Sequence, residues 1–157
     1  MPIQPVISVI DINHILISDN KSLLNLDLIH DFLHNEAPWA KGISKITIQQ
    51  AINNSICYGA YLDNKQIGFA RLVTDKATFG YLCDVFTISK YRKQGVASKI
   101  LHEIFAQDWV KNLRRTVLVT SNAHNTYRPL GFEDLSNPER YMELHRPLVY
   151  DQNQSSI

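Results

Sequence analysis

The order of apolar and polar residues predicts alternating strands and helices along most of the chain. Residues 6–17 are apolar and β-branched, which predicts a first strand. Apolar residues then recur every three or four positions from 24 to 33, which is typical of a helix that must end before Pro38. Ser44 is suited to cap a second helix, which a pair of asparagines ends at 53–54.

The middle of the chain predicts a hairpin and a central strand. Residues 56–62 and 66–74 are aromatic and β-branched, and the turn residues 63–65 separate them. Residues 78–88 carry apolar side chains on both faces, which is typical of a central strand covered by helices on each side.

The last third returns to a helical period over residues 97–109, followed by a buried strand at 116–120. A short helix at 122–130 and a last strand at 141–145 complete the prediction. A length of 157 residues fits one domain, with its core at about 6–146 and a polar tail at 147–157.

The composition and the net charge exclude several classes of function. Apolar residues make up 45% of the chain and charged residues 20%, which indicates a folded core. A net charge of +1 gives no global field for nucleic acid or an anionic membrane. The chain shows neither a signal segment nor an apolar run approaching the ~20 residues of a membrane span, so we expect a cytoplasmic protein. Cys57 and Cys83 lack metal-ligand spacing and are interpreted as reduced core thiols.

The strongest chemical signal is the string Arg92-Lys93-Gln94-Gly95-Val96-Ala97, between the central strand and the amphipathic helix. The first N–H groups of a helix have no internal partner and lie at the positive end of its dipole, so this loop is suited to bind a pyrophosphate. Gly95 lets the backbone approach closely, and Arg92 and Lys93 supply positive charge. The string is neither a P-loop, which needs Gly-Lys-Ser/Thr, nor a dinucleotide fingerprint, which needs three spaced glycines.

This string resembles the Arg/Gln-x-x-Gly-x-Gly/Ala signature of the GNAT family of N-acetyltransferases. Tyr127 and the pair Gly131-Phe132 match the family's spacing, as does Ala123 four residues before the tyrosine. The similarity covers residues 56–132. Four residues depart from the family pattern: Thr87, Ser89, Thr120 and Pro129, the last of which disfavours a continuous helix.

The resemblance implies an α/β fold with a mixed, mostly antiparallel central sheet, a V-shaped strand splay and helices on both faces. It also implies acetyl-CoA as cosubstrate, without a metal, and transfer of its acetyl group to a primary amine of a small molecule or a protein. The cofactor-binding residues under this interpretation are Val85, Phe86, Thr87, Arg92, Lys93, Gln94, Gly95, Val96, Ala97, Ser98 and Ala123.

Two residues are candidates for catalysis. The resemblance assigns Tyr127 as proton donor to the departing thiolate, and the alternative is a packed aromatic side chain. Asp84 lies in an apolar run, where an unpaired carboxylate is costly to bury. Strand alternation places it on the face of Leu82 and Phe86. It is interpreted either as a base or anchor for the acceptor amine or as an ion pair with Arg71, and the sequence leaves both open.

Further candidates surround this set. Trp39 and Tyr81 are candidates to line the acceptor pocket, with structural packing as the alternative for Trp39. His124 is predicted to face solvent, and so is the helix face with His30 and His34, which lacks a third metal ligand.

Two rival functions remain at this stage. One is a non-catalytic acyl-CoA sensor of the same fold, and the other is a nucleic-acid-binding domain using Lys111, Arg114 and Arg115, which we interpret as a solvated helix end. We expect no nucleic-acid or membrane partner. Homodimers are frequent in such folds, but no exposed stripe in the sequence establishes one.

Overall fold

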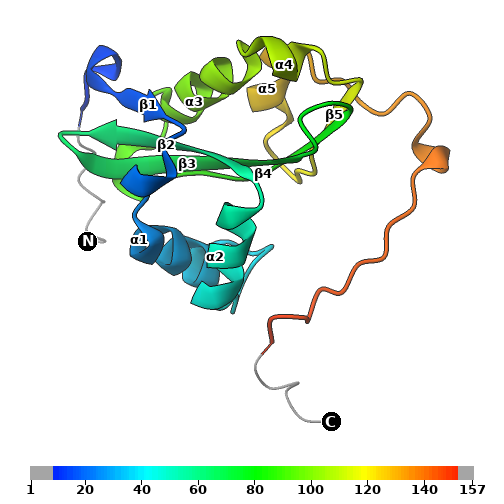
Figure 1. The fold of residues 1–157 in the computed structure, drawn as a ribbon, viewed down its shortest axis with the longest axis horizontal. Coiled ribbons are helices and arrows are strands. Elements are labelled where there is room, and N and C mark those ends of the chain that lie inside the picture. The colour runs from blue at the N-terminus through cyan, green and yellow to red at the C-terminus, as the bar shows by residue number, and fades with distance from the viewer. Residues whose placement is uncertain (1–8, 152–157) are drawn as a thin grey trace, which may run out of the picture.

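The computed structural model describes residues 9–151, arranged around one five-stranded sheet (Figure 1). The strands follow the order of the chain across the sheet: β1 (Leu16–Ser18), β2 (Ile56–Leu62), β3 (Lys65–Thr74), β4 (Phe79–Thr87) and β5 (Arg115–Val117). The first four are antiparallel and β5 is parallel to β4, which confirms the mixed, mostly antiparallel sheet. A parallel pair needs a long crossover, which α3 (Val96–Phe105) and α4 (Asp108–Lys111) supply.

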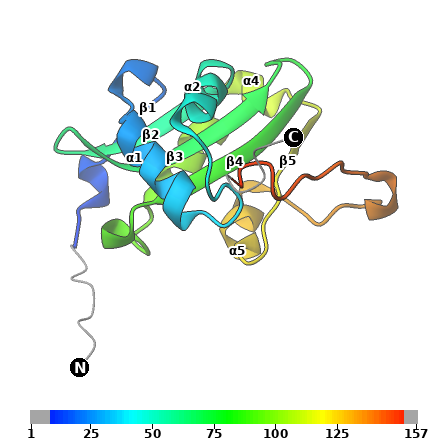
Figure 2. The ribbon, with the colours of Figure 1, turned by 90° about the horizontal axis from the view of Figure 1, so that it is seen from below.

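Helices cover both faces of the sheet, as Figures 1 and 2 show. One face carries α3, whose buried Ile100, Leu101 and Ile104 pack in a cluster with β3 residues such as Leu72. The opposite face carries α1 (Leu26–Asp31) and α2 (Lys45–Asn53), and the residues of this second cluster include Ile29, Phe32, Leu33, Ile48, Ile52, Phe69 and Phe86. The core is therefore divided by the sheet into two apolar layers.

Local signals set most element boundaries as predicted. The Ser44 hydroxyl accepts a hydrogen bond from the N–H of Thr47 (3.2 Å) and caps α2. Asp63 and Asn64 both adopt left-handed backbone angles (φ 49° and 64°), the conformation of a two-residue turn between β2 and β3. The first helix continues beyond α1 as a π-helical turn (Phe32–Glu36) and ends before Pro38. The predicted helix at 97–109 is divided into α3 and α4.

The first strand is much shorter than predicted. Residues 6–8 lie outside the described part of the chain, and only Leu16–Ser18 pairs with β2. A 3₁₀ turn (Ile12–His14) precedes it, because the Asp11 carboxylate accepts the N–H of Asn13 (3.0 Å) and favours a turn over an extended chain. Two further 3₁₀ turns lie between β1 and α1 (Lys21–Leu23) and between β4 and α3 (Ser89–Tyr91).

The C-terminal part departs most from the prediction. The predicted buried strand at 116–120 forms only Arg115–Val117, and Val119 is 82% exposed. The predicted helix at 122–130 forms α5 (His124–Tyr127) and a 3₁₀ turn (Arg128–Leu130), because Pro129 cannot continue an α-helix. The predicted strand at 141–145 is wrong: the chain there pairs with no other described strand and follows a 3₁₀ turn (Pro138–Arg140). It stands away from the sheet on the right of Figure 1.

Across residues 9–151, no helix combines the length and the apolar character needed to cross a membrane.

Candidate active site

Strands β4 and β5 pair briefly and then separate. Their register ends at Tyr81 and Val117, whereas β4 continues to Thr87. Over residues 82–87, the edge of β4 that faces away from β3 therefore pairs with no strand of the described chain. This splay, predicted from the resemblance, leaves a row of backbone groups open to a ligand.

The direction of these backbone groups follows from the pairing with β3. The N–H of Ile88 donates to the carbonyl oxygen of Ile67 in β3 (2.9 Å). Successive N–H groups of a strand point to opposite edges, so those of Thr87 and Val85 face the splay. Phe86 is in register with β3 and its buried ring stacks on Phe32, with 3.9 Å between the ring centroids. Thr87 and Val85 thus each present a backbone N–H donor at this edge.

A bulge in β4 decides where Asp84 points. Asp84 has a left-handed φ of 53°, and the register with β3 slips by one residue, so that Asp84 and Val85 together lie opposite Ala70. As a result Leu82 packs in the α3 cluster and Phe86 in the cluster beneath α1 and α2. The expectation that Asp84 shares a face with both was wrong, because simple alternation fails at a bulge.

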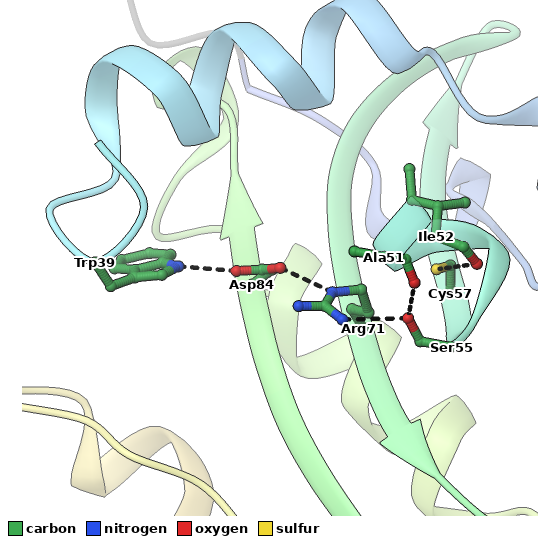
Figure 3. A network of polar contacts seen from close by, with 7 residues as sticks. All are labelled: Trp39, Ala51, Ile52, Ser55, Cys57, Arg71 and Asp84. Atoms are coloured by element: carbon green, nitrogen blue, oxygen red, sulfur yellow. Dashed lines mark hydrogen bonds and ion pairs between the residues drawn. The ribbon is translucent and has the colours of Figure 1, made fainter. Parts of the chain in front are cut away.

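Asp84 is the centre of a polar network that links three elements (Figure 3). One carboxylate oxygen pairs with Arg71 Nε on β3 (2.9 Å), and the other accepts the indole N–H of Trp39 (2.9 Å). The Arg71 guanidinium also donates to Ser55 Oγ (3.2 Å), which donates to the carbonyl oxygen of Ala51 in α2. The side chain of Asp84 is only 10% exposed and that of Arg71 19%. The ion pair that the sequence left open is therefore present.

The candidate acceptor residues lie beside this network. Trp39, in the connection between the π-helical turn and α2, is 56% exposed although its N–H is bound to Asp84. Tyr81 lies half-buried on β4, and burial, reinforced by Cys83 and Asp84, raises the pKa of its hydroxyl. The structure brings Trp39 and Asp84 into direct contact and places Tyr81 on the same strand as Asp84.

The loop after β4 presents the start of α3. Gly95 is the N-cap residue with a left-handed φ of 87°, and no side chain caps the first turn. Lys93 is also left-handed (φ 62°) and is exposed. The Val96 side chain is buried in the core, so only its backbone is available, whereas Ser98 is exposed. An uncapped ten-residue helix of this kind binds anions through its N–H groups and its dipole.

The Arg92 side chain contacts the end of β4 and the first helix. Its Nε donates to the carbonyl oxygen of Thr87 (3.1 Å), and its guanidinium lies 3.5 Å from a carboxylate oxygen of Glu36 and 6.0 Å from the centre of the Phe32 ring. Through these contacts Arg92 links the loop to the end of β4 and to the first helix.

The N-terminal segment, residues 10–15, is hydrogen-bonded to the same loop and to α3. Gln94 Oε1 accepts the N–H of Ile10 (2.9 Å), and Lys99 Nζ donates to the carbonyl oxygens of Ile12 (2.7 Å) and Ile15 (2.9 Å). Lys99 is not among the predicted site residues, because its contacts to distant backbone oxygens leave no pattern in the sequence.

Tyr127 lies at a cavity of about 430 Å³, which we name the β5 cavity. Its lining includes residues 116–120, His124, Tyr127, Arg128, residues 132–135 and Pro138. The Tyr127 ring packs edge-on to Phe132 (6.0 Å between centroids), and its hydroxyl has no hydrogen-bond partner among the described residues. Burial raises the pKa of this hydroxyl, which keeps it protonated at neutral pH. His124 is exposed at the cavity rim, and the N–H of Ala123 donates to Thr120 Oγ1 (3.0 Å).

The two helical histidines are structural. His30 and His34 both hydrogen-bond the carbonyl oxygen of Ile43 (3.1 and 2.9 Å) and are half-buried. The prediction that they form a solvated helix face was therefore wrong. In the described part of the chain, no group of three or more histidine, cysteine, aspartate or glutamate side chains is placed to hold a metal ion.

Comparison with known proteins identifies the family. Residues 53–134, which are 82 of the 157 residues, match the Acetyltransferase (GNAT) domain. A GNAT-family acetyltransferase structure from Xanthomonas campestris pv. campestris has 38% identity and a TM-score of 0.86, over 88% of this chain and 97% of that one. The protein belongs to the GNAT acetyltransferase family, and its fold is the GNAT fold.

Two further relatives are similar over most of their length. A protein from Gibberella zeae, described as an acetyltransferase, is 29% identical over 76% of this chain and 79% of its own. A Clostridium acetobutylicum structure described as a predicted acetyltransferase with acetyl-CoA has a TM-score of 0.61 at 19% identity, over 83% of this chain and 94% of that one. The second similarity concerns the fold alone.

Proposed function

We propose that this protein transfers the acetyl group of acetyl-CoA to a primary amine by direct attack in a ternary complex. The observation that carries the proposal is the junction of two open backbone sites: the unpaired edge of β4 and the uncapped N-terminus of α3. They follow one another in the chain, so one extended ligand with a pyrophosphate can occupy both. The acetyl-CoA described for the Clostridium structure fits this chemistry.

The backbone donors and polar side chains at the start of α3 match the chemical groups of acetyl-CoA. The N–H groups of Val96 and Ala97, with exposed Lys93 and Ser98, would hold the pyrophosphate. Gly95 provides the left-handed turn that presents them. The outward N–H groups on β4 would bind the amide-containing arm, as an added strand binds a sheet edge.

The same edge is suited to activate the thioester. An N–H of Val85 or Thr87 would donate to the carbonyl oxygen, on which negative charge develops during attack. The amine nitrogen bonds to the carbonyl carbon, the carbon–sulfur bond breaks, and Tyr127 donates its proton to the sulfur. The proton lost by the amine passes to solvent, from which Tyr127 is reprotonated.

A covalent acyl-enzyme is disfavoured by the state of both thiols. Burial raises the pKa of Cys57 to about 11. Burial and the adjacent carboxylate of Asp84 raise that of Cys83 to about 12. Each thiol is therefore protonated at neutral pH and a poor nucleophile. Direct attack by the acceptor needs neither.

We assign Asp84 and Trp39 to the acceptor side. Because Arg71 already neutralises Asp84, the carboxylate is a weak candidate for a base and a better one for a positioning residue. It holds the indole of Trp39, whose exposed ring is suited to form an apolar wall for the acceptor together with Tyr81.

The decisive experiment is isothermal titration with acetyl-CoA, followed by a free-thiol release screen against pooled amines. We expect micromolar binding and thiol release that depends on an amine. Binding without release over a broad panel of small amines and amine-bearing peptides would favour a sensor. Absence of binding would overturn the proposal.

A further inference from the structure

The start of α3 is held by contacts from two other segments, although no side chain caps it. Lys93 and Gly95 both have left-handed backbone angles (φ 62° and 87°), and such an angle is unfavourable for a residue with a side chain. A backbone of this kind keeps its shape only where neighbouring contacts fix it. Arg92 supplies such contacts from the end of β4, and the N-terminal segment, residues 10–15, supplies the others.

Lys99 connects the N-terminal segment to α3 through both its backbone and its side chain. Its N–H donates to the carbonyl oxygen of Gly95 (3.0 Å) and closes the first turn of the helix. Its Nζ donates to the carbonyl oxygens of Ile12 (2.7 Å) and Ile15 (2.9 Å), which precede it by 87 and 84 positions in the sequence. One residue therefore couples the position of the N-terminal segment to that of Gly95.

The helix itself does not explain why an ammonium group lies here. Lys99 belongs to the first turn of α3, where the positive end of the helix dipole disfavours a cation. Among residues 9–151, Lys99 forms no ion pair with a carboxylate. Its partners are two backbone carbonyl oxygens, which is the arrangement expected of an anchor for a distant segment.

The segment that Lys99 holds lies against the loop. A Cβ on Gly95 would lie 4.0 Å from Ile12 Cδ1, which places the Ile12 side chain beside the glycine turn. The N–H of Ile10 donates to Gln94 Oε1 (2.9 Å). Ile10 and Ile12 also pack against the α3 cluster. The N-terminal segment therefore supports the two residues that directly precede the helix.

We propose that Lys99 is a positioning residue for acetyl-CoA, and that residues 10–15 form part of the structure that presents its pyrophosphate site. This inference rests on the proposed function. By holding the segment against Gly95 and Gln94, Lys99 fixes the directions in which the first N–H groups of α3 point. Donors that are already aligned lose less conformational freedom when the ligand binds, which raises affinity. The Gln94 side chain acts in the same way, through its bond to the segment.

The variant Lys99→Met tests this role, since methionine keeps an apolar stem of similar length and removes the ammonium group. Titration calorimetry should show about tenfold weaker binding of both acetyl-CoA and CoA, because the two ligands share the pyrophosphate. With an amine that the thiol-release screen identifies, the KM for acetyl-CoA should rise by the same factor, while kcat and the KM for the amine stay unchanged. Lys99→Arg keeps the charge and the N–H donors and should restore most of the affinity.

Lys21→Met is the matched control. Lys21 Nζ also donates to a distant backbone carbonyl oxygen, that of Asn53 (3.5 Å), but Lys21 lies between β1 and α1 and outside the loop. This variant should bind acetyl-CoA as the wild type does. Unchanged affinity in folded Lys99→Met would overturn the positioning role and leave the proposed function standing. A wild type that binds neither acetyl-CoA nor CoA would overturn both.

A second measurement separates anchoring from a direct effect of the lysine charge. Gln94→Met removes the oxygen that accepts the Ile10 N–H and leaves the charge of the protein unchanged. If both residues act through the N-terminal segment, the double variant should lose less affinity than the product of the two single losses. Losses that multiply would show that Lys99 acts by its charge alone and would overturn the anchoring role. If Lys99→Met does not fold, unchanged affinity in Gln94→Met would overturn the role of the segment.

Discussion

At the residue scale, the protonated phenol of Tyr127 is the group best suited to assist a departing thiolate. Burial raises its pKa, the hydroxyl has no partner within residues 9–151, and the side chain lines the β5 cavity. A hydroxyl that stabilises nothing in the fold can be removed without unfolding the protein. Its contribution to turnover can therefore be measured separately.

Tyr127→Phe should lower kcat by roughly 100-fold, because the leaving sulfur loses its proton donor. The dissociation constant for acetyl-CoA and the Tm should stay unchanged. Steady-state kinetics, titration and thermal melting check the three quantities. Tyr91→Phe removes another half-buried phenol outside the β5 cavity and should leave kcat unaltered. Full turnover in the Tyr127→Phe variant would exclude Tyr127 as the proton donor to the thiolate.

The second residue-scale feature is the Asp84 ion pair with Arg71, which under the proposed function also positions the acceptor wall. Asp84→Asn leaves the mostly buried guanidinium of Arg71 without its counter-charge. Unfolding in urea should show a loss of about 2 kcal/mol, and the acceptor KM should rise while that for acetyl-CoA does not.

Trp39→Phe is the matched control for that variant. It removes the indole N–H donated to Asp84 and replaces the bicyclic side chain with a single aromatic ring at an exposed position. Its stability should fall by less than about 1 kcal/mol. An Asp84→Asn protein as stable as the wild type would show that the ion pair contributes nothing measurable.

At the element scale, the start of α3 depends on the backbone of Gly95. Its φ of 87° disfavours any side chain, although a Cβ there would meet nothing closer than Ile12 Cδ1 at 4.0 Å. The glycine is required for its backbone angle and not for space. A substitution at this position therefore tests the geometry of the helix start.

Gly95→Ala should reduce stability by about 1 kcal/mol and weaken acetyl-CoA binding about tenfold, because the first-turn N–H groups turn away from the ligand. Gly131→Ala imposes a similar strain (φ 98°) with open space around it and should leave acetyl-CoA affinity unchanged. Titration calorimetry compares the two. Equal affinities in both variants would contradict a pyrophosphate site at α3.

At the scale of the whole molecule, the buried thiols and phenols make stability sensitive to alkaline pH. The folded-state pKa is raised to about 11 for Cys57, about 12 for Cys83 and about 12 for Tyr61, in each case mainly by burial. In the unfolded chain a thiol ionises near pH 8.5 and a phenol near pH 10, as rough reference values. Between these limits the unfolded state binds fewer protons, so stability falls as pH rises.

The free energy of unfolding should therefore be flat below about pH 8 and fall by about 2 to 4 kcal/mol by pH 10. Urea titrations at several pH values measure it. A double variant with Cys57→Ala and Cys83→Ala should start from lower stability and show a shallower fall. If the free energy of unfolding of the wild type stays constant up to pH 10, burial does not raise the pKa of these groups in the folded state.

The sequence by itself determined the elements that depend on neighbours in the chain. The Ser44 cap, the Asp63–Asn64 turn, the end of α5 before Pro129 and the glycine turn into α3 are set by local backbone preferences and short-range hydrogen bonds. The family resemblance, which rests mainly on one strand–loop–helix unit, added the mixed sheet, the splay and the prediction of an acetyl-CoA loop.

Only the tertiary structure decided the features that depend on distant segments. The bulge that turns Asp84 toward Arg71 arises from pairing between two strands, and no periodicity in β4 alone reports it. The apolar residues around Met142 predict a strand at 141–145, but the segment pairs with no other described strand. Local preferences cannot encode such long-range constraints, since each is set by the free energy of contacts between residues far apart in the chain.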